Sequence, residues 1–107
     1  MGFPEEKETT PETFLQNDRH NKIGVRMYRN NMPYIPENDS TLDALVLLPD
    51  GTTITNNQNA SIHEHIAEMT LSNACYAQEG PIQIAIRLTS GTQVMTVGVI
   101  RGTVYPS

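Results

Sequence analysis

Aromatic residues and cysteine are scarce in this sequence. It contains no tryptophan, two phenylalanines and four tyrosines among 107 residues. Carbohydrate-binding faces commonly present exposed aromatic rings, so this composition weakens the case for a sugar-binding protein. The single cysteine, Cys75, cannot form an internal disulfide, and the fold therefore does not depend on oxidation.

Basic residues and long apolar runs are also few. The seven lysines and arginines are scattered singly and the net charge is -5, which argues against nucleic-acid binding, because that function needs a basic patch. No apolar run approaches the length of a membrane span or of a signal-peptide core. We therefore expect a soluble protein that is made and folded in a cytoplasm, with neither nucleic acid nor membrane as a partner.

The clearest pattern that is present lies in residues 81–104. Branched residues alternate with other residues over positions 82–88, and this period of two places them on one face of a strand. A short loop containing Gly91 follows, and then a second run rich in valine and threonine. Two such runs separated by a glycine-containing loop predict a β-hairpin, which we expect at the centre of an antiparallel sheet.

Further strands are predicted on both sides of the Pro49-Asp50-Gly51 turn and near the start of the globular part. These strands cover residues 23–28, 42–48 and 52–55, and the apolar end of the second predicts burial on both faces near Val46 and Leu48. Residues 72–77 predict one helical turn. A chain of this length forms one domain. The pattern predicts an all-β fold: a small antiparallel Ig-like β-sandwich of six or seven short strands over residues 22–107, preceded by an extended N-terminal arm.

Residues 61–71 fit two structures. As a helix, Ser61 and Glu64 would form a capping box, with Ile62, Ile66 and Met69 on one face. As a strand, alternate residues from Ala67 onward would point inward. We favour a strand over residues 63–71, because a sheet built from two hairpins needs further strands as partners.

The N-terminal arm, residues 1–21, differs from the rest of the chain. It carries five acidic and two basic residues, hence -3 of the net charge, and its large apolar residues after the start methionine are Phe3, Phe14 and Leu15. Such a segment cannot bury enough apolar surface to fold alone. It is either a disordered tail or an arm that docks on a neighbouring subunit through these three residues. Residues 11–15 predict one helical turn with Thr10 as N-cap.

Reactive side chains form no convincing catalytic set. In a single strand His63 and His65 would share a face and, with Glu68 or His20, could bind zinc, but we favour a solvated polar edge. Cys75 has small neighbours that favour a buried thiol over a nucleophile. We therefore expect no enzyme activity, no metal and no cofactor. The remaining Asp and Asn residues fit turn and cap positions, with loop asparagines that tolerate a left-handed backbone: Asp39, Asp43, Asp50, Asn30, Asn31, Asn56, Asn57 and Asn59.

The order of these features resembles a known family. A strand with Val-Arg-Met-Tyr-Arg-Asn at 25–30 leads to Pro-Tyr-Ile-Pro at 33–36, then to an apolar strand ending in Pro-Asp-Gly at 49–51. Leu-Ser-Asn-Ala-Cys-Tyr-Ala at 71–77 then precedes the hairpin. Over residues 22–105 the chain resembles the N-terminal domain of the phage baseplate upper protein family. Family members usually continue into a fibre or trimerisation region that is not part of this sequence.

The resemblance implies a non-enzymatic structural protein of a bacteriophage virion, attached to tail, baseplate or fibre components through its sandwich and N-terminal arm. We expect other virion proteins as partners, a homo-oligomer or multi-copy lattice, and contacts through Phe3, Phe14, Leu15 and Tyr34. A capsid decoration protein or head-fibre adaptor is an alternative. A second alternative is a host-surface or glycan-binding module that uses the loops around Tyr34, residues 56–59 and Tyr76.

Overall fold

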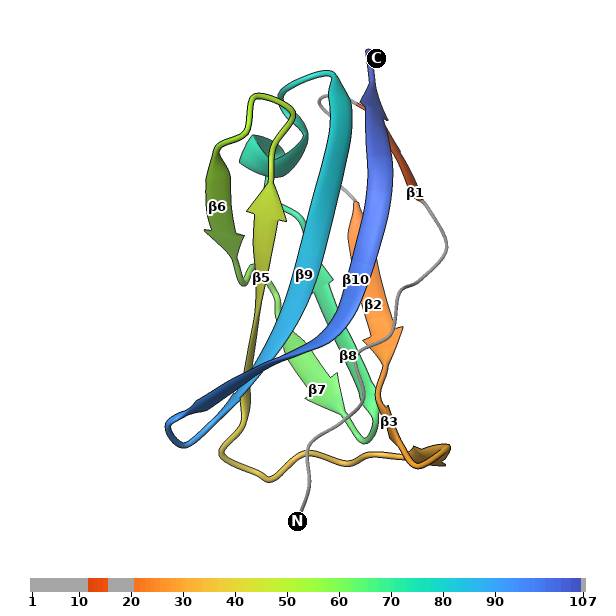
Figure 1. The fold of residues 1–107 in the computed structure, drawn as a ribbon, viewed down its shortest axis with the longest axis vertical. Helices are drawn as coiled ribbons and strands as arrows, with labels where there is room; N and C mark the ends of the chain where they lie inside the picture. The colour runs from red at the N-terminus through yellow and green to blue at the C-terminus, as the bar shows by residue number, and fades with distance from the viewer. Residues whose placement is uncertain (1–11, 16–20, 107) are drawn as a thin grey trace.

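The computed structural model describes residues 21–106 together with the backbone of residues 12–15. These residues form strands and one short 3-10 helix, η1 (Asn73–Tyr76), with no α-helix among them (Figure 1). The strands are β1 (Glu12–Leu15), β2 (Lys22–Arg26), β3 (Tyr28–Arg29), β4 (Met32–Pro33), β5 (Thr41–Leu47), β6 (Thr53–Asn56), β7 (Ser61–His63), β8 (Ile66–Thr70), β9 (Gly80–Ser90) and β10 (Gln93–Tyr105). The prediction of an all-β fold is confirmed, although there are more strands than the expected six or seven and two of them are long.

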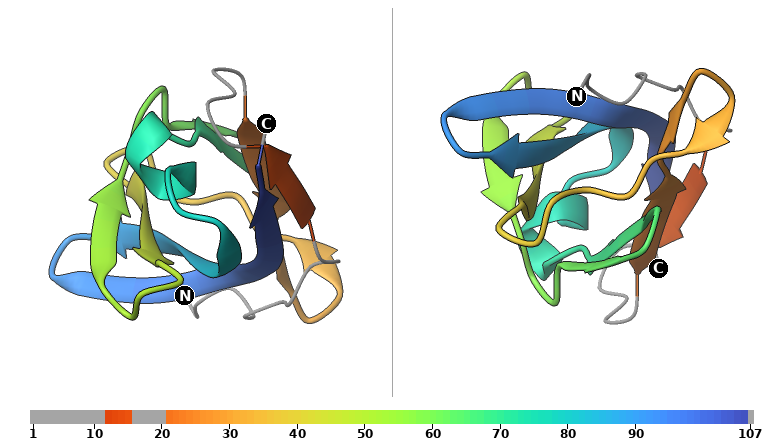
Figure 2. Two further views of the ribbon diagram at one scale, coloured as in Figure 1. Left: turned by 90° about the horizontal axis from the view of Figure 1, so that it is seen from above. Right: turned by 90° about the horizontal axis from the view of Figure 1, so that it is seen from below.

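Two sheets face each other as a sandwich. The larger sheet has the order β1-β10-β9-β5-β6 and the smaller has the order β2-β8-β7; Figure 2 shows them enclosing a shared interior. Strands β3 and β4 form a separate small hairpin. The orders β10-β9-β5-β6 and β2-β8-β7 follow the connectivity of immunoglobulin-type sandwiches, in which consecutive strands are distributed between two sheets in this way. The structure therefore agrees with the Ig-like prediction.

The hairpin of β9 and β10 lies at the centre of the larger sheet, as predicted. Its two-residue turn begins at Gly91, whose φ is 62°, and a glycine at this position suits a type II′ turn, whose twist matches the flanking strands. The pairing register shifts between Thr96 and Gly98, so Val97 is the extra residue of a β-bulge that increases the local twist.

The core is built by alternate residues of facing strands, as the period of two requires. Buried apolar side chains from the two sheets and from η1 form one cluster: Ile23, Val25, Met27, Leu42, Ala44, Val46, Leu48, Ala67, Met69, Leu71, Cys75, Tyr76, Ile82, Ile84, Ile86, Leu88, Val97, Ile100 and Val104. The predicted burial on both faces at the end of β5 is wrong. Val46 and Leu48 are buried, but Leu47 between them is 42% exposed on the outer face.

The region 61–71 is extended, which confirms the strand prediction over the helical one, but it is not a single strand. A two-residue turn at Glu64 and His65 separates β7 from β8, and His63 pairs with Ile66 across it. Glu64 has a φ of 56°, a left-handed conformation that side chains other than glycine and asparagine seldom adopt. Because neither turn position is a glycine or an asparagine, the sequence did not predict this turn.

The predicted helical turn over residues 11–15 is wrong for the part that is described. Glu12–Leu15 form β1, which pairs in parallel with Gly102–Tyr105 of β10. A five-residue helix cannot offset its nucleation cost, whereas the free edge of β10 offers hydrogen-bond partners to an extended segment. Strand β1 thus attaches the charged arm to β10, which is the last strand in the sequence.

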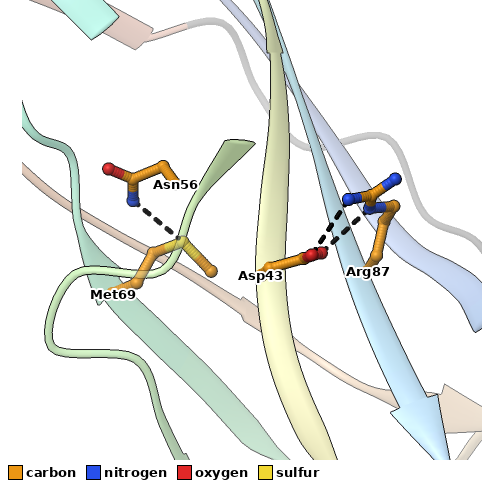
Figure 3. Close-up of polar contacts among 4 residues, drawn as sticks. All are labelled: Asp43, Asn56, Met69 and Arg87. Atoms are coloured by element: carbon orange, nitrogen blue, oxygen red, sulfur yellow. Dashed lines mark hydrogen bonds and ion pairs between the residues drawn. The ribbon is translucent and has the colours of Figure 1, made fainter. Parts of the chain in front are cut away.

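A buried asparagine connects the two sheets (Figure 3). Asn56, at the end of β6, is only 4% exposed. Its Nδ2 donates to the carbonyl oxygen of Thr70 at 3.0 Å and contacts Met69 Sδ at 3.4 Å, while its Oδ1 accepts from the amide of Ser72 at 2.9 Å. The prediction of a loop residue is wrong for Asn56, which ends β6, but it is confirmed for Asn30, Asn31, Asn57 and Asn59. Of these four, Asn30, Asn31 and Asn59 have positive φ values.

Candidate functional site

The structure places the predicted partner-binding residues in different settings. Phe14 and Leu15 belong to β1, where their backbones pair with Val104 and Tyr105. Phe3 lies outside the described residues. Tyr34 is partly buried against the core, and its amide donates to the carbonyl oxygen of Met27 at 2.9 Å. Tyr34 therefore helps to hold the connection between β4 and β5 against the sandwich.

The two histidines do not share a strand face, because the β7–β8 turn separates them. His63 ends β7, and the ring of His65 packs edge-on against Tyr28 with a centroid separation of 5.7 Å. No group of three or more His, Cys, Asp or Glu side chains suited to a metal ion occurs among the described residues. Cys75 is buried, and this burial raises the pKa of its thiol, as expected of a packing residue.

A surface groove of about 370 Å³ crosses the outer face of the larger sheet at one end. Leu47, Gln83 and Arg101 are register partners on three neighbouring strands and form one row across it. We call this feature the outer groove; its lining residues are Leu47, Leu48, Pro49, Gly51, Pro81, Ile82, Gln83, Arg101 and Gly102. Among the described residues that line it, Arg101 is the only charged one, and most of the others are apolar.

The arm joins the sandwich beside the outer groove. Glu12, the first residue of β1, pairs with Gly102, which also lines the groove. Tyr105, at the far end of the same strand pairing, is 50% exposed. The described part of the arm, an apolar groove and an exposed tyrosine thus occur together at the end of β10. This arrangement is the best candidate for an attachment surface.

The same outer face carries an ion pair further along β5 and β9. Arg87 Nε and Nη2 each donate to a different carboxylate oxygen of Asp43 at 2.9 Å (Figure 3), and these bonds raise the pKa of Arg87. Asp43 was predicted to lie in a turn or at a strand end with a turn or cap role. It lies near the start of β5, and its carboxylate bridges to the neighbouring strand β9 instead of capping a turn. Between this pair and the outer groove lies the row of Leu45, Ala85 and Val99, which is apolar.

The turn prediction holds for Asp50. Its Oδ1 accepts hydrogen bonds from the Thr52 hydroxyl at 2.6 Å and the Thr52 amide at 2.9 Å. The Thr52 hydroxyl is the largest cause of a lowered pKa of the Asp50 carboxyl, followed by the Thr52 amide, and Gln78 adds a bond to Oδ2. These bonds fix the loop between β5 and β6, whose Gly51 forms part of the groove wall.

The loops predicted for a binding module come together only in part. Asn56 and Tyr76 are buried, and the Tyr76 hydroxyl donates to Asn73 Oδ1 at 2.8 Å within the connection between the sheets. Asn57 is exposed and lines a cavity together with residues 35–38, which follow Tyr34 in the chain. The outer groove was not predicted from the sequence. Its main signal there is Leu47, an apolar residue at the position of the strand alternation that faces outward.

No protein-family model matches the chain, and no curated protein matches it in a sequence search. Among the described residues, no helix is long and apolar enough to cross a membrane.

Proposed function

We propose that this chain is a non-enzymatic structural protein of a bacteriophage virion, which attaches to tail, baseplate or fibre components through its sandwich and N-terminal arm. The main observation in support of attachment through the arm is the position of β1. The arm meets the sandwich where the outer groove and Tyr105 are exposed. The resemblance to the baseplate upper protein family supports the place of action.

The chemistry of this surface suits a protein partner. The groove buries apolar area on contact, which drives association. The N-terminal arm pairs with the edge of β10 over Gly102–Tyr105, next to the groove.

The first test is the copy number of this chain in purified particles, measured against the major capsid protein by mass spectrometry. A low ratio that matches tail components supports the proposal. A ratio near one to a few capsid subunits identifies a capsid decoration protein or head-fibre adaptor instead. Absence of the chain from particles overturns the structural function altogether.

The attachment surface is tested with two matched variants. Leu47→Glu places a charge in the outer groove, whereas Val94→Glu makes the same change at the tip of the β9–β10 hairpin, where Val94 is 58% exposed. Both side chains are exposed, so stability should change by no more than about 0.5 kcal/mol. Leu47→Glu should lose incorporation into particles while Val94→Glu retains it; equal incorporation of both variants contradicts the role of the groove.

Two truncations separate the parts of the arm. Removal of residues 1–11 retains β1, whereas removal of residues 1–19 also exposes the edge of β10 at Gly102–Tyr105. Both truncated proteins should keep the β-rich circular dichroism spectrum, because the core comes from later residues. We expect the longer truncation to abolish incorporation. Normal incorporation of that protein would refute an attachment role for the arm.

A further inference from the structure

The second cavity of the molecule lies on the opposite edge of the sandwich and has a different chemistry. Its volume is about 500 Å³, within the range of small-molecule sites. We call it the edge cavity; its lining residues are Ile35, Pro36, Glu37, Asn38, Ser40, Thr41, Leu42, Asn57, Ala60, Ser61, Ile62 and Glu64. Seven of these twelve residues are polar, in contrast with the apolar lining of the outer groove.

The edge cavity exists because the larger sheet is incomplete there. Strand β5 pairs with β9 over Thr41–Leu47, but with β6 only over Ala44–Leu47. Its first residues therefore have no strand beside them on that side among the described residues. The edge strand β7 of the smaller sheet and the connection before β5 form the other walls. A turn closed by the Ser40 amide, which donates to the Glu37 carbonyl oxygen at 3.0 Å, shapes this connection.

The charges in the cavity restrict its ligand. Glu37 and Glu64 line it, and none of the other described lining residues is a lysine, arginine or histidine. A phosphate, sulfate or carboxylate ligand would be repelled by these two carboxylates and by a chain whose net charge is -5. The two glutamates do not belong to any group suited to hold a metal ion in the described chain, so their chemistry is that of hydrogen-bond acceptors.

The remaining groups favour a ligand rich in hydroxyls. Each ligand hydroxyl both donates and accepts, which matches carboxylate acceptors together with the amides of Asn38 and Asn57 and the hydroxyls of Thr41 and Ser61. The other lining serine, at position 40, has a buried Oγ without a hydrogen-bond partner in the described structure, so one hydrogen bond remains unmade at this wall.

Apolar surface accompanies these polar groups. Leu42 is 7% exposed and packs in the core, Ile62 and Ala60 pack against the core from β7 and the preceding loop, and Pro36 lies in the opposite wall. A sugar ring presents carbon-hydrogen surface between its hydroxyls and therefore matches a mixed lining. The two glutamates would repel anionic ligands, and purely apolar ligands would leave the cavity's polar groups unpaired.

We propose that the edge cavity binds a neutral saccharide unit of a glycan. This site is independent of the proposed attachment function, because it uses different residues at the other end of β5. Because none of the described lining residues is aromatic, the affinity for one sugar unit should be weak, in the millimolar range.

The test is an NMR titration of the full ¹⁵N-labelled chain with sugars that differ in charge. The probes are methyl glucoside, methyl galactoside and N-acetylglucosamine as neutral ligands, glucosamine as a cation, glucuronic acid as an anion, and glycerol as a simple polyol. At least one neutral sugar should shift the amides of Thr41, Ser61 and Ile62 at concentrations up to about 50 mM. Glucuronic acid should bind at least tenfold more weakly.

Paired variants connect any binding to the cavity. Glu64→Gln keeps the shape but removes an anionic acceptor, and should weaken neutral-sugar binding several-fold. Glu79→Gln, the same change at an exposed residue outside the cavity, should not. The proposal is overturned if no neutral sugar shifts these amides, if glucosamine alone does, if glycerol does so equally, or if both variants behave like the unchanged protein. Incorporation into particles is measured separately, so the two proposals fail independently.

Discussion

Replacement of Asn56 by alanine should destabilise the sandwich more than its small size suggests. The change removes the hydrogen bond to the Thr70 carbonyl and leaves the amide of Ser72 without its acceptor in a buried setting. A buried unpaired donor costs about 1–3 kcal/mol and a lost hydrogen bond about 1 kcal/mol. The free energy of unfolding should therefore fall by about 3 kcal/mol, which corresponds to roughly 10–20 °C in Tm for a domain of this size.

Asn56→Asp makes this prediction specific to the hydrogen bonds. The carboxylate can accept from Ser72 but cannot donate to Thr70, whereas the protonated acid can do both. Burial next to a carbonyl oxygen should raise the folded-state pKa above its unfolded value of about 3.9. The folded state then binds the proton more tightly, so the deficit relative to the unchanged protein should be smallest below about pH 4 and should grow as pH rises through the folded pKa.

Urea unfolding followed by far-ultraviolet circular dichroism measures these effects, since the chain has no tryptophan. Asn57→Ala is the matched control, because Asn57 is the adjacent exposed asparagine; it should change stability by no more than about 0.5 kcal/mol. A cost below about 1 kcal/mol for Asn56→Ala, or a pH-independent deficit for Asn56→Asp, would refute the role assigned to these bonds.

Three further predictions concern turns and the outer face. Glu64→Gly should stabilise the protein by about 1 kcal/mol, because it removes the strain of a glutamate in the left-handed backbone conformation. An unchanged or lower Tm contradicts this. Thr52→Val should raise the pKa of Asp50 toward its ordinary value in an NMR titration, since it removes the hydroxyl that is the largest cause of the lowering. A double-mutant cycle on Asp43 and Arg87 should give a coupling of about 1 kcal/mol that decreases at high salt; no coupling would show that the bidentate pair contributes nothing.

The sequence was most informative where one local pattern determined the structure. Residues 82–88 alternate strictly, and their pairing as β9 at the centre of the larger sheet follows from that alternation and from the Gly91 turn. The turn at Pro49, Asp50 and Gly51 and the helical turn at η1 were predictable for the same reason. In each case the residues that cause the structure are adjacent in the chain.

Features that depend on distant partners were not predictable. Asn56 follows a threonine and precedes another asparagine, which is typical of a loop; its burial depends on Thr70 and Ser72, fourteen and sixteen positions away. Residues 12–15 become a strand only because the edge of β10, ninety positions later, is available. The outer groove forms where three neighbouring strands place Leu47, Gln83 and Arg101 in one row. No single segment of the sequence predicts that alignment.

The positions of the two candidate surfaces define how the molecule would be oriented in an assembly. Thr41 and Leu42 at the start of β5 line the edge cavity, and Leu47 at its end lines the outer groove. At about 3.3 Å per residue, these sites lie roughly 15–20 Å apart along one strand. A partner held at the groove and at β1 would contact the end of the sandwich where β10 finishes, leaving the edge cavity at the opposite end of β5. Attachment and glycan contact would then occur in the same copy without competing for surface, because one rigid strand separates them.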